Sequence, residues 1–582
     1  MTATQAGPPA MEPEDSGPGG PGLHGDSTDT GAAVTVSRAV RADDADDGTG
    51  PDDGTAGRIA ALRARLVSPM PDDRLWGWLG PLLVTAFAAF FRFNRLAIPR
   101  AVIFDETYYV KDAWSILKHG VEWNWVSIPD NLNYVNDQIA AGHFTASLFQ
   151  SCSGTSCGEY VVQPPVGKLL IAVGEWLYGL NSFGWRFSSA LFGSLAILVM
   201  CRVARRMTRS TLLGCLAGLL LSLDGLEFVL SRTGILDIFL MFFVLAAFGA
   251  LVVDRDVSRA RLAEAMVLAP GDDAGPALGI RKWRVAAGIL IGLGCATKQY
   301  GVWYIFAFAG LCIAWDIGAR RAVGLRDYVR GALVRDGKWL PLTLGVIPLV
   351  TYIVTWTGWF VTNTGYDRDY AQQNGFNVPV LSELYSLYEY HKEMLQFGVS
   401  LSLRHPYESQ PWGWLVISRP VAFFYQCYTG PTNYHVCPAN YTGPEWSQEV
   451  LAIGNPAIWW AAIPALLFCL CWWFTRRDWR AGAAVLCFAA GWVTWLPFVS
   501  RTKFYYYAIE FEPFIILCIV LCLGLIIGPV TASLRRRAAG SAVVGAYVLA
   551  VVALFWYFYP ILAGKVIPYS DWLSHMWYHG WI

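Results

Sequence analysis

Long apolar runs separated by polar segments dominate the chain after residue 75. A helix needs about 20 mostly apolar residues to cross the hydrocarbon core of a membrane. Eleven runs are expected to be transmembrane helices: residues 77–96, 184–203, 210–230, 234–253, 284–301, 302–318, 339–360, 456–475, 481–499, 511–530 and 541–562. The stretch 284–318 is read as two passes joined by a tight turn at Tyr300-Gly301. The pattern therefore predicts an all-α polytopic membrane protein.

Basic residues follow every second predicted pass, which assigns an orientation. Lys and Arg are enriched in short loops on the cytoplasmic side of a membrane. Such clusters lie at residues 202–209, 255–284, 320–338, 476–480 and 535–537. The N-terminus is therefore predicted to lie inside and the C-terminus outside. The two longest polar loops, residues 97–183 and 361–455, are then both extracytoplasmic.

The composition agrees with a membrane protein. The 582 residues are 55% hydrophobic and only 15% charged, whereas soluble domains carry roughly 25% charged residues. The formal net charge is zero, so no global basic field points to nucleic acid as a partner. Membrane lipids are the expected surroundings.

The start of the chain differs from the rest. Residues 1–57 are rich in Gly, Pro, Asp, Ser and Thr and are expected to be a disordered cytoplasmic tail, because so few large apolar residues cannot offset the entropy of ordering. No cleavable signal peptide is expected, since the first apolar run comes after Arg74 and should stay as a membrane anchor. Residues 58–582 then form one transmembrane domain.

Most of the 13 cysteines lie in apolar stretches, where they are expected to act as small hydrophobic residues. Two close pairs, Cys152 with Cys157 and Cys427 with Cys437, lie instead in the two outer loops. Their spacing suits disulfides in an oxidising compartment. Zinc is the rival interpretation, but no partner His or Cys pair completes a four-ligand set. No metal site is predicted.

An acidic pair, Asp105-Glu106, begins the first outer loop shortly after the first predicted pass. A carboxylate near the membrane surface can take a proton from a hydroxyl nucleophile. On a helix the two side chains point in different directions, so they need not share one role. The alternative is a plain helix start, because acidic residues favour the first turn.

Several cations lie where the orientation rule disfavours them. Four are in short outer loops: Arg232, Lys298, Arg501 and Lys503. Snorkelling to the interface is one explanation, and an anionic group at this face, such as a phosphate, is the other. Arg186, just inside the second pass, is a candidate because an intramembrane charge is costly. So is Asp237, whose alternative is a structural pairing with Arg232.

A pair of prolines precedes an amphipathic stretch in the first outer loop. The segment runs from Gln163 through Pro164-Pro165 to Lys168. Proline suits the start of a helix, so a helix is expected to begin here. Lys168 would then lie near the interface, where binding of a lipid phosphate and snorkelling are both open.

In this order, these motifs resemble those of the protein O-mannosyltransferase family. The quoted residues are Phe-Asp-Glu-x-Tyr-Tyr at 104–109, Pro-Pro-x-Gly-Lys at 164–168, Arg-x-x-x-Leu-Asp at 232–237, Lys298 before Tyr300-Gly301, Pro411-Trp412 to Pro420, and Arg501-x-Lys-Phe-Tyr-Tyr-Tyr. The resemblance extends from about residue 75 to the end and looks like a bacterial, actinobacterial member. One departure is Gln163, where the family usually has His.

The resemblance implies a GT-C-type glycosyltransferase without a cofactor. Its donor would be polyprenyl-phosphate mannose, and its acceptors Ser or Thr hydroxyls of exported polypeptides, met at the Sec translocon. Asp105 would be the base of a single inverting displacement, with Glu106 positioning the acceptor or sugar. Arg186, Lys168, Arg501 and Lys503, in that order, would face the leaving phosphate, with support from Arg232, Asp237, Lys298 and Gln163.

Two rival functions follow from the same features. A related transferase would move another sugar, such as an aminoarabinose, to a lipid acceptor. A transporter would also use many passes and intramembrane charges, but transporters often show internal repeats and sites near the midplane. No repeat is visible here, and the candidate polar residues gather at one face. For the loop 361–455, covering an acceptor groove and burial against the bundle are both open.

Overall fold

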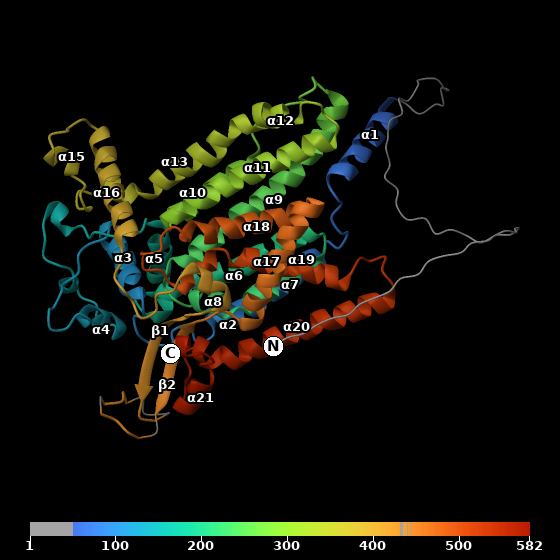
Figure 1. Ribbon diagram of the computed structural model, residues 1–582. Coiled ribbons are helices and arrows are strands. Elements are labelled where there is room, and N and C mark those ends of the chain that lie inside the picture. The colour runs from blue at the N-terminus through green and yellow to red at the C-terminus, as the bar shows by residue number, and fades with distance from the viewer. Residues whose placement is uncertain (1–50, 431–434, 439, 444) are drawn as a thin grey trace, which may run out of the picture. The chain divides into compact units, whose positions relative to one another are not determined.

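The computed structural model describes residues 51–430, 435–438, 440–443 and 445–582 (Figure 1). Residues 1–50 of the predicted tail (residues 1–57) lie outside the described residues. Residues 51–57 are helical, because they belong to α1 (Pro51–Leu66), so the expectation of disorder is wrong for this part. The good helix formers Ala, Leu and Arg in the second half of α1 explain the helix.

Seven helices in the described part of the chain are long and apolar enough to cross a membrane. Six of these spans are built on one long α-helix each. The seventh runs from Tyr328 to Thr355. It begins with α12 (Tyr328–Arg330), continues through π-helical turns and ends with α13 (Ile347–Thr355). The six are α2 (Trp76–Phe93), α6 (Ser182–Thr208), α9 (Asp237–Leu268), α11 (Val302–Ala322), α17 (Pro456–Arg476) and α20 (Leu534–Leu562). The mostly helical polytopic fold is confirmed, whereas the small sheet described below was not predicted.

The other four predicted passes fold as shorter helices, so eleven full-length spans are not found. They are α7 (Thr211–Ser222) with α8 (Gly225–Leu230), α10 (Lys282–Cys295), α18 (Trp479–Trp492) and α19 (Glu512–Ile527). Asp224 explains the break between α7 and α8, because its carboxylate accepts a hydrogen bond from the Leu226 amide at 2.8 Å and caps α8. The turn at Tyr300-Gly301 is confirmed as a 3₁₀ turn before α11.

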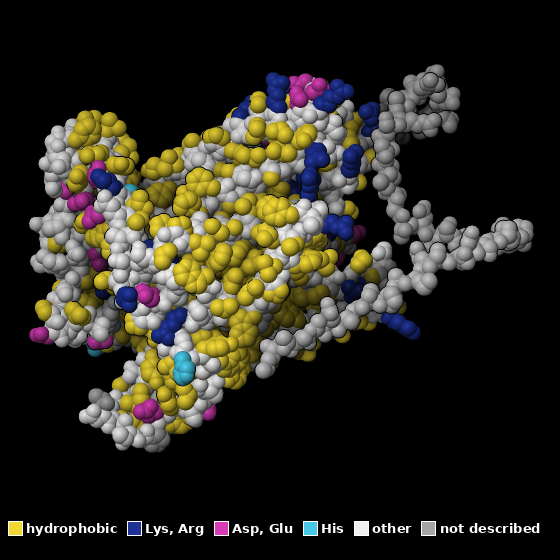
Figure 2. Space-filling view, viewed as in Figure 1, with side chains coloured by type: hydrophobic (Ala, Val, Ile, Leu, Met, Phe, Trp, Pro, Cys, Tyr) yellow, Lys and Arg dark blue, Asp and Glu magenta, His cyan; other side chains and the backbone are white. Residues whose placement is uncertain are grey.

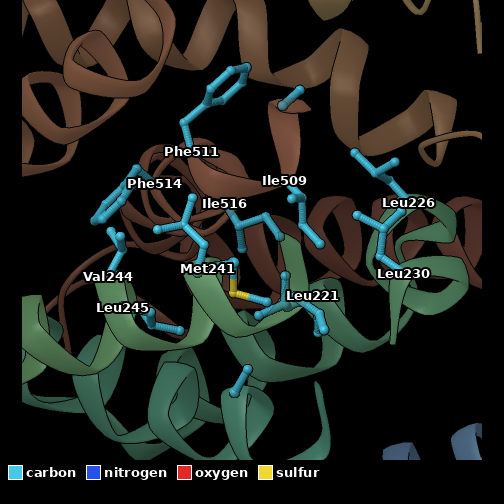
Figure 3. Close-up of a cluster of buried hydrophobic side chains, with 14 of the residues drawn as sticks. Leu221, Leu226, Leu230, Met241, Val244, Leu245, Ile509, Phe511, Phe514 and Ile516 are labelled. Atoms are coloured by element: carbon cyan, nitrogen blue, oxygen red, sulfur yellow. The ribbon is translucent and has the colours of Figure 1, made fainter. Parts of the chain in front are cut away.

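The bundle is held by one large core of buried apolar side chains. Figure 3 shows a part of this core in which Leu221, Met241 and Phe514 come from three different helices. Ile509 joins them from the 3₁₀ segment Tyr505–Glu510, whose residues are all buried. The packing therefore fixes this short segment, which carries part of the site described below, against the helices.

The two outer loops are folded. The first holds α3 (Glu106–His119), α4 (Tyr134–Ala140) and α5 (Val166–Tyr178), and the predicted helix start after the prolines is confirmed. The second begins with the end of α14 (Thr357–Val361) and holds α15 (Tyr370–Gln373) and α16 (Leu381–Ser400). Figure 1 shows α3, α4 and α16 at the same end of the bundle. Disulfides join Cys152 to Cys157 and Cys427 to Cys437, as predicted.

A small antiparallel sheet completes the outer part. Its strands are β1 (Val421–Tyr428), β2 (Trp446–Ala452) and β3 (Val566–Pro568), in the order β1-β2-β3. The strand β3 leads directly into α21 (Tyr569–Ser574). The sheet therefore joins the second outer loop to the end of the chain, and β1 is one of its edges.

Candidate active site

Asp105 immediately precedes α3 and contacts a residue far away in sequence. Its Oδ2 accepts a hydrogen bond from the Tyr506 hydroxyl at 3.1 Å. Tyr506 lies in the buried 3₁₀ segment before α19, whereas Asp105 is a half-buried residue. The packing of that 3₁₀ segment thus holds one carboxylate oxygen of Asp105 in place.

A buried ion pair lies behind this carboxylate. The Lys298 Nζ donates to both oxygens of Asp237, at 2.9 and 2.8 Å, and the Tyr300 hydroxyl donates to Asp237 Oδ1 at 3.3 Å. Lys298 and Asp237 come from the segment before α11 and from the first residue of α9, both predicted as supporting residues. The structure brings them together, and Arg232 is not the partner of Asp237.

Burial raises the pKa of Asp105 to about 6, helped by the charge of Asp237 and opposed by Lys298 and by the hydrogen bond from Tyr506. A carboxylate with a pKa of about 6 is still mostly ionised at neutral pH, yet it is a stronger base than an ordinary Asp. General bases work best when their pKa lies near the working pH. Asp105 therefore has the protonation behaviour of a general base.

Glu106 has a different environment from Asp105. Its carboxylate accepts from Arg186 Nε at 2.7 Å and Arg186 Nη2 at 2.9 Å, and both side chains are fully buried. The backbone amides of Gly234 and Ile103 donate to the same carboxylate at 2.8 and 3.0 Å. Glu106 therefore anchors the start of α3 to α6 and to the segment before α9.

The prediction that Arg186 faces the donor phosphate is not supported by this geometry. Beyond Glu106, its guanidinium donates to the carbonyls of Leu96, Pro99 and Ala101 at 3.3, 2.8 and 2.9 Å. All three guanidinium nitrogens are hydrogen-bonded within the protein, and no part of the residue is exposed. The costly intramembrane charge that marked Arg186 in the sequence is explained by its pairing with Glu106.

Lys168 and Arg232 also have their partners within the protein. Lys168 is buried against Glu122, with Asp112 3.7 Å away, so its predicted phosphate contact is not supported either. Arg232 donates to four backbone carbonyls at the end of α2, those of residues 91, 92, 94 and 95. Such donation satisfies the orphan carbonyls of a helix end. Gln163 lies half-buried in the turn before α5, with no further role assigned by the structure.

Arg501 and Lys503 differ from the other candidate cations. Among the described residues neither has a carboxylate within ion-pair distance; Arg501 donates to the carbonyls of Gly398 and Thr502, and Lys503 to that of Phe498. The Arg501 guanidinium lies 5.2 Å from the ring centre of Trp495. Both cations precede Tyr506 by a few residues in the sequence. Arg501 is half-buried, whereas Lys503 is 1% exposed.

Aromatic rings connect the site to the small sheet. Phe104, the residue before Asp105, stacks on Phe423 of β1 with ring centres 4.5 Å apart. Tyr506 meets both rings edge-on, at 5.4 Å from Phe104 and 5.5 Å from Phe423. Sequence reasoning assigned no role to Tyr506 or Phe423. The run Tyr505-Tyr506-Tyr507 was the available signal, whereas nothing in the sequence pairs Phe423 with Phe104.

The described residues contain no group of three or more His, Cys, Asp or Glu side chains that could hold a metal ion. The site contains the Asp105 carboxylate, the buried Lys298–Asp237 pair and a group of aromatic rings, and two cations without a carboxylate partner among the described residues lie on the chain shortly before Tyr506. A carboxylate can accept a proton from a hydroxyl, and cations stabilise a leaving group that gains negative charge. The arrangement suits group transfer from a phosphate-linked donor.

The fold is similar to that of a solved protein O-mannosyltransferase. The yeast protein O-mannosyltransferase Pmt1-Pmt2 complex, solved with its sugar donor, matches with a TM-score of 0.63 over 90% of this chain and 94% of that chain, at 15% sequence identity. Two family models match: dolichyl-phosphate-mannose-protein mannosyltransferase at residues 156–357, and the C-terminal four-transmembrane region of protein O-mannosyltransferase at residues 383–581.

Curated relatives agree over most of the chain. The polyprenol-phosphate-mannose–protein mannosyltransferase of Mycobacterium tuberculosis is 37% identical, covering 88% of this chain and 93% of that protein. The enzyme of the same name from Corynebacterium glutamicum is 31% identical, covering 90% and 98%. The chain therefore belongs to the protein O-mannosyltransferase family and is a membrane glycosyltransferase.

Proposed function

We propose that this protein transfers mannose from polyprenol-phosphate mannose to Ser or Thr hydroxyls of polypeptides. The donor and the protein acceptor are those in the names of the bacterial relatives. The observation that carries the proposal for this chain is the Asp105 carboxylate, held by Tyr506 and raised in pKa to about 6 at the outer end of the bundle. Such a group is what activation of a hydroxyl requires.

The proposed chemistry is a single inverting displacement. The acceptor oxygen forms a bond to the anomeric carbon of mannose as its proton passes to Asp105. The bond between that carbon and the phosphate oxygen breaks, and polyprenyl phosphate leaves with the electron pair. Glu106 takes no part in proton transfer, because Arg186 and two backbone amides already engage it; it positions Asp105 by fixing the start of α3.

The leaving phosphate is proposed to face Arg501 and Lys503. Fixed cations that need no reorganisation lower the barrier when negative charge develops on a leaving group. These two side chains lack a carboxylate partner in the described structure, whereas Arg186 and Lys168 are already paired. This reverses the order of preference drawn from the sequence. Lys298, paired with Asp237, sets the charge around Asp105.

The site is proposed to face the extracytoplasmic side of the plasma membrane, with the N-terminus in the cytoplasm. Figure 2 shows Lys and Arg side chains gathered at the end of the bundle near α11 and α12, which the positive-inside rule places in the cytoplasm. The two disulfides lie in the loops predicted to be outside, an oxidising location. Acceptors are then exported polypeptides, and we propose that they are met near the Sec translocon.

The experiment that tests this function uses purified protein in vesicles, radiolabelled polyprenyl-phosphate mannose and a peptide with a single Thr. The expected result is mannose on the peptide, linked to the Thr and with inverted anomeric configuration. A peptide in which Ala replaces the Thr is the matched control. Label that appears on a lipid but not on the peptide would contradict the proposal and favour the transferase with a lipid acceptor.

A further inference from the structure

The strand β1 presents an unpaired backbone edge next to the site. The sheet order leaves β2 between β1 and β3, so one side of β1 has no strand partner in the sheet. Figure 1 shows this side of β1 pointing away from β2 and α21. Among the described residues, the backbone of residues 421–426 makes no hydrogen bond outside the sheet. Such an edge is a template for another extended chain.

The far end of this edge is closed by the protein itself. The Cys437 amide donates to the Cys427 carbonyl at 3.2 Å, and the Thr429 amide donates to the His435 carbonyl at 2.9 Å. The disulfide between Cys427 and Cys437 holds this return of the chain against β1. The unpaired edge is therefore limited to residues 421–426, about 20 Å at about 3.3 Å per residue. Val421 and Phe423 are buried, and the exposure of the strand increases toward Tyr425.

The other end of the edge reaches the acidic residue. Phe423 stacks on Phe104, the residue next to Asp105, and meets Tyr506, which donates to the Asp105 carboxylate. The side chain of Phe423 thus lies on the face of the sheet that points toward Asp105. In a sheet, side chains at matching positions of neighbouring strands point to the same face. The register of β1 shifts between Ala422 and Phe424, which marks a β-bulge at Phe423. A strand added beside β1 would direct every second side chain toward one face on each side of this bulge.

We propose that the acceptor polypeptide binds as an added β-strand along residues 421–426, which brings its Ser or Thr hydroxyl to Asp105. This inference rests on the proposed function and names how the same site takes its acceptor. Main-chain hydrogen bonds supply affinity in this mode of recognition without demanding a particular sequence. It suits an enzyme that acts on many different polypeptides while they are extended and unfolded.

The inference also explains what selects the acceptor residue. The edge would pair with the acceptor backbone, while the Asp105 carboxylate would accept the proton of one side chain that carries a hydroxyl. Tyr425 on β1 is 43% exposed, although its hydroxyl is hydrogen-bonded to Ser447 of β2 and its ring packs on Trp572 of α21. We propose that its exposed part contacts neighbouring side chains of the acceptor. A proline in the paired segment would remove a donor from the added strand and weaken binding, because proline has no amide hydrogen.

The test is a scan of the acceptor peptide by backbone N-methylation. Each amide of the peptide is methylated in turn, and kcat/KM for mannose transfer is measured with the wild-type protein in vesicles. Pairing with β1 uses only the amides that point to the edge, so we expect losses of at least about tenfold at alternate positions and near-normal rates between them, with the alternation interrupted once, opposite the bulge at Phe423. Uniform losses, or losses without a period of two, would overturn the inference.

A second measurement reports the location directly. A photo-reactive benzoylphenylalanine is substituted for Tyr425 in one variant and for Tyr388 of α16, also exposed, in the matched control. We expect illumination to crosslink the labelled peptide to the first variant and not to the second. Equal crosslinking at both positions, or crosslinking at position 388 alone, would overturn the inference.

Different outcomes test the β1 acceptor site and the proposed function. Transfer to the unmodified peptide together with a scan that lacks alternation overturns the β1 site and leaves the proposed function standing. No transfer to any peptide, from a preparation that binds polyprenyl-phosphate mannose, overturns the proposed function and the β1 site with it.

Discussion

Tyr506 donates a hydrogen bond to Asp105 across 401 positions of the sequence, at 3.1 Å. The bond joins the start of the first outer loop to the short 3₁₀ segment that precedes α19. It stabilises the ionised form of a carboxylate that burial would otherwise push further toward protonation. The base strength of Asp105 is therefore set jointly by distant parts of the chain.

The first prediction concerns pH. A base with a pKa of about 6 is active only when ionised, so kcat/KM should rise with pH through about 6 and then level off. Tyr506→Phe removes a hydrogen bond that lowers this pKa, so the rising limb should move to higher pH. The measurement is the pH profile of transfer for both proteins. A profile for Tyr506→Phe that coincides with the wild type would contradict the assigned role of the bond.

The second prediction concerns Arg186 and Glu106. Arg186→Met leaves the buried Glu106 carboxylate unpaired, and breaking a buried ion pair on one side costs about 3–5 kcal/mol of folding free energy. We expect a clear loss of thermal stability in detergent. The double variant Glu106→Gln with Arg186→Met should recover part of the loss, because no unpaired charge is left.

A structural role for Arg186 has a kinetic counterpart. The Arg186→Met protein that remains folded should have a donor KM close to that of the wild type. A large rise in the donor KM of this folded fraction, without loss of stability, would contradict the structural role and indicate that Arg186 binds the donor phosphate.

The third prediction concerns the leaving phosphate. Arg501→Gln and Lys503→Gln each remove a cation that has no carboxylate partner among the described residues, so kcat should fall by at least about tenfold for either variant. The matched control is Lys392→Gln on α16, whose ammonium pairs with Glu389 at 2.9 Å. Steady-state transfer with varied donor is the measurement. Rates equal to that of the control variant would show that neither cation faces the phosphate.

The fourth prediction concerns metal ions. In the proposed mechanism, the single phosphate of the donor faces two side-chain cations, and no step is assigned to a divalent ion. Treatment with EDTA, followed by assay in metal-free buffer, should therefore leave the rate within about twofold of the untreated protein, since smaller changes lie below about 0.5 kcal/mol. A loss that added Mg²⁺ or Mn²⁺ restores would contradict this part of the account.

Local sequence patterns predicted much of this molecule. Apolar runs and basic clusters indicate a polytopic helical protein, and both patterns can be read from residues that are adjacent in the sequence. The disulfides between Cys152 and Cys157 and between Cys427 and Cys437 were also predictable, since each pair is close in sequence. The lengths of the helices were not predictable from hydropathy. For example, the Asp224 cap that interrupts the predicted span 210–230 depends on a local hydrogen bond.

The roles of the charged residues depended on tertiary contacts. Arg186 and Glu106 are 80 positions apart, and Lys298 and Asp237 are 61 apart, so no local pattern pairs them. A lone intramembrane charge in the sequence was therefore open to both a ligand and an ion pair. In the structure, Arg186 pairs with Glu106 and Lys168 pairs with Glu122. The remaining candidates for the phosphate are therefore Arg501 and Lys503.

The most direct test of the central claim is the rate of mannose transfer by Asp105→Asn. The substitution keeps the size of the side chain and an oxygen that can accept from Tyr506, but it removes the base. The ionised Asp105 is disfavoured by burial, so the variant should be at least as thermally stable as the wild type at pH 7. We predict normal stability and donor binding with transfer reduced by about 10²–10⁴-fold. Near-normal transfer by the folded variant would contradict the assignment of Asp105 as the base.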